Sequence, residues 1–174
     1  MADHGADVGA DHGSGEAATA AAPAALAAIE AAGIPHRVTA HGPVGSLAEA
    51  AAARGVRPGD IVKTLVVRRA DDDFLLVLVP GDREISWPKL RALLGVNRLS
   101  MPAADAAQQA TGYERGTITP FGSLRPWPVI ADSTVAGRPI SLGAGAHGVA
   151  FGADGSDVIR ALEAQVADVT DPLD

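Results

Sequence analysis

The first half of the chain predicts two helices, a strand and a β-hairpin from its pattern of apolar and polar positions. Two apolar runs rich in β-branched residues, Ile61–Arg69 and Phe74–Val79, are joined by four mostly polar residues, which is typical of an antiparallel hairpin. Ser46 followed by Glu49 predicts a capping box that opens a helix ending near Arg54. The other elements expected here are a helix over Ala24–Ala32 and a strand over His36–Ala40.

The second half alternates helical segments with short apolar runs bounded by glycine and proline. Pro88 and Gly95 bound one helix, Gly112 ends another over Ala103–Ala110, and the last helix is amphipathic over Asp154–Val166. Because helices are inserted among short strands without strict alternation, we expect an α+β domain around a small, mostly antiparallel sheet or barrel. The strand candidates are Thr117–Phe121, Val129–Ala131, Pro139–Leu142 and Val149–Phe151.

The N-terminal residues 1–22 differ from the rest of the chain. They consist mainly of Gly, Ala, Asp, His and Ser and hold no large apolar side chain beyond Val8. Such a segment cannot bury enough surface to offset its ordering entropy, so we expect a disordered tail. A length of 174 residues leaves room for one domain, which we place at residues 23–170.

Charge is concentrated at the two ends. The chain carries a net charge of -7, but residues 1–22 and 153–174 hold ten of its 21 acids. The body, residues 23–152, keeps 13 cations against 11 acids, a net charge of +2. The body could therefore meet a polyanion, although composition alone does not predict one.

Several classes of protein are excluded by what the sequence lacks. Without cysteine there is no disulfide scaffold, thiol nucleophile or thiolate metal site. No run reaches the ~18 apolar residues of a membrane helix, and no basic region precedes an apolar one as in a secretory signal. His36, His41 and His147 match no metal-ligand spacing. We expect a cytoplasmic protein with no membrane partner, no metal and no cofactor.

Lys63 is the first candidate for chemistry. Twelve of the 14 cations are arginine, and lysine occurs only at positions 63 and 89. Lys63 lies in the most apolar strand, where a charge is costly unless it has a partner or a function. A compact ammonium can hold a small phosphate or polarise a carbonyl in a way that arginine cannot. The alternative is a lysine on an edge strand whose stem packs while its head reaches water. Both interpretations stay open at this point.

Two glycine-rich loops are the second candidate. Gly116–Gly122 and Gly143–Gly148 flank strand candidates, and such loops let backbone N–H groups form an anion or oxyanion site. Neither loop has the order of a dinucleotide fingerprint or a P-loop, and no Gly-x-Ser-x-Gly elbow occurs. Tight turns in a small barrel are the simpler explanation. The aromatic residues Trp87, Tyr113 and Trp127 are interpreted as loop anchors rather than base-stacking platforms.

Four motifs in a fixed order resemble one known family. They are Lys63-Thr64-Leu65, Val79-Pro80-Gly81-Asp82, Thr111-Gly112-Tyr113 and Gly116-Thr-Ile-Thr-Pro120-Phe-Gly122. Over residues 24–166 the chain resembles the YbaK-like, prolyl-tRNA-editing family of aminoacyl-tRNA deacylases. The resemblance implies a barrel-like sheet with surrounding helices. It also implies hydrolysis of the ester that joins a wrong amino acid to the terminal adenosine of a tRNA.

The resemblance also assigns roles to individual residues. It makes Lys63 the central catalytic side chain and the Gly116–Pro120 loop the wall of the amino-acid pocket. The substrate would be tRNA(Pro) mischarged with cysteine or alanine, and prolyl-tRNA synthetase is the implied protein partner. The substrate-binding positions that follow are His41, Thr64, Leu65, Gly116, Thr117, Ile118, Thr119, Pro120, Gly143, Gly145, His147 and Gly148.

The chain departs from the family pattern in its second glycine loop. The loop is one residue longer, and Ala150 stands where many members have an acid. This departure puts the substrate in question and is the best argument for an alternative, a non-catalytic module that binds aminoacyl ends or a synthetase. A small-ligand-binding barrel is a third possibility. With a body charge of only +2, tRNA would be held by a few phosphate contacts. The candidates are Arg68, Arg69, Arg83, Arg91 and Arg98.

Overall fold

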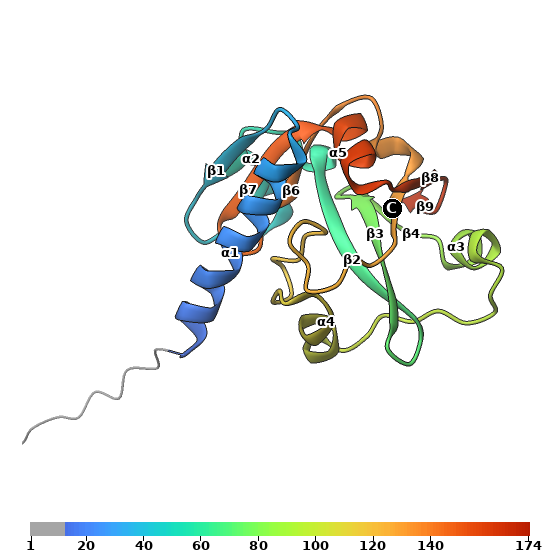
Figure 1. Cartoon of the computed structure of the whole chain (residues 1–174). Coiled ribbons are helices and arrows are strands. Elements are labelled where there is room, and N and C mark those ends of the chain that lie inside the picture. Colours follow the sequence, from blue (N-terminus) through green and yellow to red (C-terminus); the bar gives the residue numbers. More distant parts are fainter. Residues whose placement is uncertain (1–12) are drawn as a thin grey trace, which may run out of the picture.

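The expected hairpin forms the centre of a seven-stranded sheet in the computed structural model, which describes residues 13–174 (Figure 1). β2 (Ile61–Ala70) and β3 (Asp73–Pro80) pair antiparallel, with Lys63 opposite Val79. Asp72 in the connecting turn has φ 53°, a backbone conformation in which Asp is enriched. The position of the hairpin is therefore confirmed.

The sheet is mixed, which corrects the expectation of a mostly antiparallel one. Its order is β1-β7-β6-β2-β3-β5-β8. The pairs β1–β7, β6–β7 and β2–β3 are antiparallel, whereas β2–β6, β3–β5 and β5–β8 are parallel. Among the described strands β1 and β8 are the edges and no pairing joins them into a barrel, so the α+β class is confirmed without barrel closure. The remaining strands of this sheet are β1 (Arg37–Ala40), β5 (Val129–Asp132), β6 (Pro139–Gly143), β7 (Val149–Asp154) and β8 (Gln165–Ala167).

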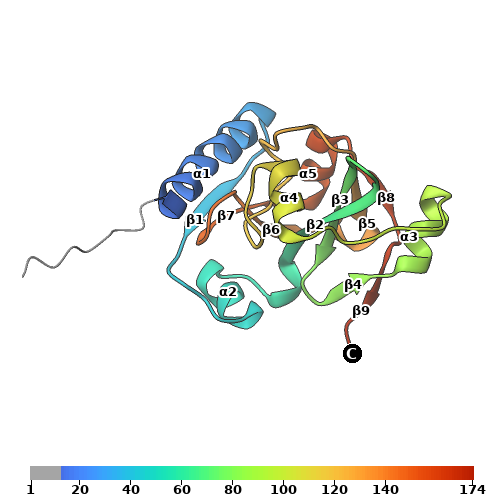
Figure 2. The same cartoon turned by 90° about the horizontal axis from the view of Figure 1, so that it is seen from below.

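Helices surround this sheet, and a second, two-stranded sheet lies beside it. Figure 1 shows α1 and α3 at opposite sides of the sheet, and the view from below in Figure 2 shows the same separation. No helix in the described part of the chain is long and apolar enough to cross a membrane. The helices are α1 (Gly13–Ala32), α2 (Leu47–Arg54), α3 (Trp87–Leu94), α4 (Ala104–Thr111) and α5 (Gly155–Leu162), with short 3₁₀ turns at Pro58–Asp60 and Ser133–Val135. The small sheet pairs β4 (Arg83–Ile85) with β9 (Thr170–Pro172).

The helix ends follow local sequence signals. The Ser46 hydroxyl accepts a hydrogen bond from the Glu49 N–H at 3.1 Å, as the capping box predicts. The Glu49 carboxylate accepts from the N–H of Gly45, one residue before the expected partner, at 2.6 Å. Gly95 and Gly112 end α3 and α4 in the left-handed conformation, as expected.

The expectation was wrong at two helix boundaries and at one expected strand. α1 begins at Gly13, so part of the expected tail is helical and Pro23 lies inside the helix, because the alanine-rich run favours helix strongly. Residues 1–12 of that tail lie outside the described residues. Thr117–Phe121 is a loop, since Gly116 and Gly122 at φ 89° and 70° turn the chain at both ends. The last helix ends at Leu162 because Glu163 adopts a left-handed conformation, and β8 follows.

The hairpin is buried on both faces. Alternate residues of β2 and β3, such as Val62 and Leu78, pack on one face with Ile29 of α1 and Val158 of α5. The other alternate residues, among them Val77, pack on the opposite face against α3 and the segment before β9. Residues opposite each other in an antiparallel pair share a face, so Lys63, opposite Val79, and Thr64, opposite Leu78, point to different faces.

Candidate functional site

A cavity lies where β2 separates from β6. The two strands pair only at Ile61–Ser141 and Val62–Leu142. Further along β2, Arg68 donates to the carbonyl of Ser100 at 2.7 Å and accepts from its N–H at 3.1 Å. The stretch between these contacts opens into a cavity of about 480 Å³. Its size is that of a pocket for a small organic ligand.

One wall of this cavity is a strand edge with unpaired backbone groups. The N–H and C=O groups of a strand alternate between its two edges. Because Arg68 bonds Ser100 on this edge, Val66 and Thr64 present their backbone groups to the same edge. Within residues 13–174 no strand pairs with that edge between Lys63 and Val67. A ligand in the cavity would therefore meet main-chain donors and acceptors.

The rest of the lining is mostly apolar, with one arginine. It comes from the segment before α4, from α4 itself, and from the first and second glycine loops. Arg115 is the charged residue that joins Lys63 there. The lining residues outside β2 are Met101, Pro102, Ala104, Ala107, Arg115, Gly116, Ile118 and Gly143.

Thr64 is a polar side chain on the face of β2 that also carries Val62 and Val66. It is 9% exposed, and its hydroxyl oxygen is buried without a hydrogen-bond partner among the described residues. An unsatisfied buried hydroxyl costs about 1–3 kcal/mol. Ser123 carries another one among the described residues, but it does not line the cavity. Thr64 lines the cavity, so a ligand there would contact this residue.

Lys63 is half-buried and anchored on the neighbouring small sheet. Its Nζ donates to the carbonyl oxygen of Arg83 at 3.1 Å, which leaves two of its three donors free for a ligand. Burial lowers the pKa of Lys63, and the nearby carboxylates of Glu84 and Asp82 oppose that shift. Lys63 contributes to the cavity wall, but its ammonium is directed to β4 rather than to the glycine loops.

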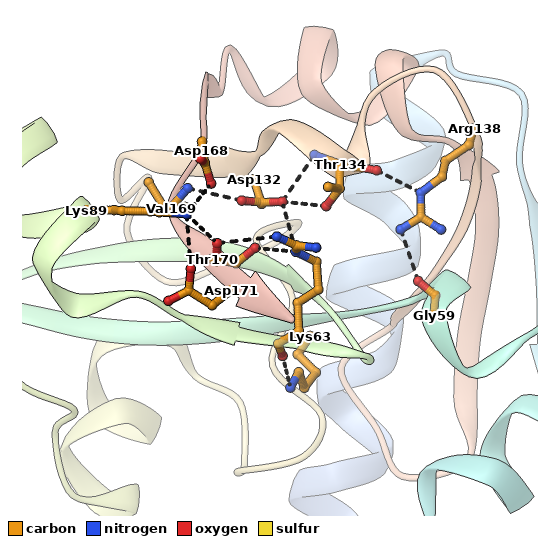
Figure 3. Close-up of polar contacts among 11 residues, drawn as sticks. Gly59, Lys63, Lys89, Asp132, Thr134, Arg138, Asp168, Val169, Thr170 and Asp171 are labelled. Carbon is orange, nitrogen blue, oxygen red and sulfur yellow. Dashed lines mark hydrogen bonds and ion pairs between the residues drawn. The ribbon is translucent and has the colours of Figure 1, made fainter. Parts of the chain in front are cut away.

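A buried polar network holds the residue that anchors Lys63 (Figure 3). The Arg83 guanidinium donates to the Thr170 hydroxyl at 2.6 Å and lies 3.8 Å from the Asp132 carboxylate. Asp132 is fully buried and accepts from the N–H groups of Val169 and Thr134, both at 3.1 Å. Burial alone would raise the pKa of Asp132, but hydrogen bonds from Thr134, Val169 and Thr170 outweigh it and lower the pKa. The C-terminal segment thus fixes the backbone to which Lys63 is bound.

The two glycine loops pack against each other beside the cavity. The Gly145 N–H donates to the Thr117 carbonyl at 3.1 Å, and the His147 ring lies 3.7 Å from the position that a Cβ on Gly116 would take. The N–H of Gly145 is therefore occupied. Within residues 13–174 the N–H groups of Gly116 and Ile118 have no hydrogen-bond partner, and both residues line the cavity.

His41 and His147 lie around this loop pair rather than in the cavity, whereas His36 lies by Ile34 and Glu30 at the end of α1. His41 donates its backbone N–H to the Gly148 carbonyl at 2.8 Å, and its ring accepts from Arg54 at 3.4 Å. The exposed His147 ring lies 3.4 Å from the Glu114 carboxylate. Gly148 has φ 76°, and a Cβ there would meet the His41 carbonyl at 2.3 Å.

The structure brings only part of the expected site together. Six expected residues line the cavity, namely Lys63, Thr64, Leu65, Gly116, Ile118 and Gly143. The others lie in or beside the two loops without lining it, namely His41, Thr117, Thr119, Pro120, Gly145, His147 and Gly148. Sequence reasoning missed Met101, Pro102, Ala104 and Ala107, which carry no motif. Arg115 was also missed, although its place next to Gly116 was a signal.

Tyr113 and Trp127 anchor the chain beside the cavity, whereas Trp87 begins α3 and packs on the face of the hairpin that carries Val77, which corrects the expectation of a loop anchor. The Tyr113 hydroxyl donates to the Phe121 carbonyl at 2.6 Å across the first glycine loop, and burial raises the pKa of Tyr113 to about 12. The Trp127 indole N–H donates to the Ala110 carbonyl at 2.8 Å. Tyr113 therefore holds the first glycine loop, and Trp127 holds the end of α4.

Comparison with known proteins identifies the class to which this domain belongs. Residues 41–161, more than half of the chain, match the sequence profile of the aminoacyl-tRNA editing domain. The chain therefore belongs to the aminoacyl-tRNA editing domain family. The expected resemblance to prolyl-tRNA-editing proteins is confirmed.

The relatives are parts of larger synthetases and small solved domains. Proline–tRNA ligases from Bacillus licheniformis and Heliobacterium modesticaldum are 34% and 39% identical over 92 and 80 residues, which is 53% and 46% of this chain. The chain spans only 16% and 14% of those ligases. The crystal structure of a protein proposed to be a trans-editing enzyme for prolyl-tRNA synthetase is 26% identical, with a TM-score of 0.78. That likeness covers 87% of this chain and 97% of the other.

Proposed function

We propose that this protein is a trans-acting hydrolase that deacylates mischarged tRNA(Pro). The proposed substrate carries cysteine or alanine in place of proline, and the proposed place of action is the cytoplasm, with prolyl-tRNA synthetase as a partner. Membership of the editing family and the likeness to prolyl-tRNA-related proteins support it. The observation that carries it is the cavity itself. Its lining combines a strand edge without a partner strand, two glycine-loop residues whose N–H groups are unpaired among residues 13–174, and Thr64, whose buried hydroxyl has no partner among the described residues.

The cavity fits an aminoacyl group with a small uncharged side chain. Met101, Ala107 and Ile118 give it an apolar surface, and no carboxylate is among its lining residues. A side chain the size of cysteine or alanine would fill only part of about 480 Å³, which leaves room for the ester and part of the terminal ribose. Apolar pockets of this kind discriminate side chains by size and hydrogen-bonding capacity.

Ester hydrolysis needs a positioned carbonyl and relief of the negative charge that develops on its oxygen. The N–H groups of Gly116 and Ile118 are proposed donors to that oxygen, each worth about 3 kcal/mol in the transition state. Lys63 would orient the ester by holding the terminal phosphate or polarising the carbonyl. No imidazole or carboxylate lines the cavity, so we propose that the attacking water is activated by a group of the substrate or through solvent.

The test is release of the amino acid from tRNA(Pro) charged with cysteine, alanine or serine. We expect turnover of cysteinyl- or alanyl-tRNA(Pro), and faster turnover of these than of correctly charged prolyl-tRNA(Pro). Hydrolysis of none of the mischarged species by the folded protein would contradict the proposal.

The second candidate is a module that binds aminoacyl ends without cleaving them. Two observations favour it: the Lys63 ammonium is bound to a backbone carbonyl, and the fully buried Ala150 supplies no acid. Saturable binding of charged tRNA without release of the amino acid in the same assay would establish this alternative.

A further inference from the structure

A second hollow, of about 430 Å³, lies at the turn end of the central hairpin. Arg68 and Arg69 of β2, Arg91 of α3 and Arg98 of the following segment line it, and we call it the arginine hollow. Asp71 is the acidic residue in its wall. Four of the twelve arginines of an acidic chain thus converge on one surface.

Most of this positive charge is not neutralised within the protein. Arg69 is paired with Asp73 at 3.0 Å. Arg68, Arg91 and Arg98 make no ion pair with any of the described residues. Arginine presents a planar fork of donors that matches phosphate oxygens. The hollow therefore has the chemistry of a phosphate-binding surface.

The backbone fixes the hollow from three segments. Gly95 ends α3 in the left-handed conformation at φ 66°, so the chain turns back beside the hairpin (Figure 1). The paired backbone hydrogen bonds between Arg68 and Ser100 then hold the returning segment against β2. Arg91 lies in the last turn of α3, and Arg98 lies two residues before the Ser100 contact. The arginines are thus presented by defined backbone rather than by a long free loop.

The hollow and the cavity are separate, but they adjoin along the same two segments. Arg68 and Ser100 line the hollow, whereas the neighbouring Val66 and Met101 line the cavity. Along β2, Thr64 and Arg68 are four residues apart, about 13 Å at the rise of a strand. A ligand with its acyl end in the cavity could therefore extend past the Arg68–Ser100 contact to the hollow.

We propose that the arginine hollow binds the phosphodiester backbone of tRNA next to the acylated 3′ end. This inference rests on the proposed function, because it takes the acyl end to lie in the cavity. A single-stranded end is recognised by a basic groove that follows its backbone, and charge complementarity favours RNA here over an apolar partner. The hollow would then supply affinity without touching the ester.

The experiment compares a double variant with a matched control. Arg91→Gln with Arg98→Gln removes two unpaired charges of the hollow, and Arg37→Gln removes an exposed charge on the distant edge strand β1. Each protein hydrolyses alanyl-tRNA(Pro) and, separately, 3′-O-alanyladenosine, which has no phosphate. We expect the double variant to raise KM for the tRNA roughly 10-fold or more, with kcat nearly unchanged, and to leave the nucleoside ester unaffected. The Arg37→Gln control should match the parent protein on both substrates.

Direct binding separates this inference from the proposed function. The double variant should weaken binding of uncharged tRNA and reduce the slope of log K against log salt by about two, one for each lost phosphate contact. If the double variant weakens tRNA binding in this way but the parent protein hydrolyses no charged tRNA, the proposed role of the arginine hollow is supported and the proposed hydrolase activity is contradicted. An unchanged salt slope and an unchanged KM in the double variant would contradict tRNA binding by the arginine hollow. The same conclusion would follow if the double variant lost binding to an acidic protein partner while its tRNA binding stayed intact. Thermal unfolding of each variant confirms that it is folded. Keeping the charge with Arg98→Lys in place of Arg98→Gln should recover part of the tRNA affinity.

Discussion

Replacing Thr64 by valine gives opposite effects on stability and on activity. Valine has nearly the same shape and removes only the buried hydroxyl, which has no partner in this structure. An unsatisfied buried hydroxyl costs about 1–3 kcal/mol, so Thr64→Val should raise the free energy of unfolding by up to that amount. About 1 kcal/mol corresponds to a rise in Tm of roughly 2–4 °C for a domain of this size.

The same change should lower activity, because the hydroxyl is proposed to bind the ligand. Loss of one neutral hydrogen bond is worth about 0.5–1.5 kcal/mol, which is roughly a 2- to 13-fold loss in kcat/KM. Thr111→Val is the matched control. Thr111 is also buried, but its hydroxyl donates to the Ala107 carbonyl at 2.8 Å and accepts from the Tyr113 N–H at 3.2 Å.

The prediction is tested by denaturant unfolding and deacylation kinetics of the parent protein, Thr64→Val and Thr111→Val. The Thr111→Val variant should lose stability because the groups that its hydroxyl satisfies become unpaired. If Thr64→Val were destabilised as much as Thr111→Val, the hydroxyl would have a partner that this structure does not contain. Full activity of a stabilised Thr64→Val protein would remove Thr64 from the site.

Three further changes test the supporting structure. Asp132→Asn should lower the free energy of unfolding by about 3 kcal/mol, because it leaves the half-buried Arg83 guanidinium without its counter-charge. The pKa of Asp132 is lowered in the folded protein, so the parent loses this advantage as the pH falls below about 4. Unfolding measured against pH should therefore show the two proteins becoming more alike in acid. Tyr113→Phe should lower the free energy of unfolding by about 1 kcal/mol below pH 10, because it removes the hydrogen bond to Phe121. The parent protein should lose stability between pH 10 and about 12, because Tyr113 ionises there only in the unfolded chain. Unfolding curves at alkaline pH should show no such loss from this position in the variant. Gly148→Ala should cost about 1–3 kcal/mol through its left-handed backbone and its clash with His41, and an unchanged Tm would show that the loop can shift.

The elements that carry their own local signal could be predicted from the sequence. The hairpin has two β-branched runs with a short polar turn, and the helices have Ser46, Gly95 and Gly112 at their ends. These signals act over a few residues, so they do not depend on the rest of the fold.

Elements stabilised by distant partners could not be predicted in the same way. β9 is the polar tripeptide Thr170–Pro172, and it becomes a strand only because β4, more than 80 residues earlier, pairs with it. The parallel pairing of β2 with β6 is likewise non-local. The mixed character of the sheet therefore had no signal in the periodicity of single strands.

The candidate site likewise has residues that could be predicted from the sequence and residues that could not. Lys63 and the glycine loops were recognisable from residue type and motif order. The apolar wall from Met101 to Ala107 was not, because ordinary aliphatic residues become a pocket only when the chain places them opposite β2. The hydrogen bond from Lys63 to Arg83 also depends on the C-terminal network around Asp132.

The most direct test of the proposed chemistry is single-turnover hydrolysis of alanyl- and cysteinyl-tRNA(Pro) by the parent protein and by Lys63→Ala. We expect hydrolysis by the parent and a loss of roughly 100-fold or more in the variant, with its unfolding curve and tRNA affinity little changed. Lys63→Arg should recover little of the rate, because a guanidinium cannot take the place of a compact ammonium. Hydrolysis at the parent rate by a folded Lys63→Ala protein would contradict the role of this lysine.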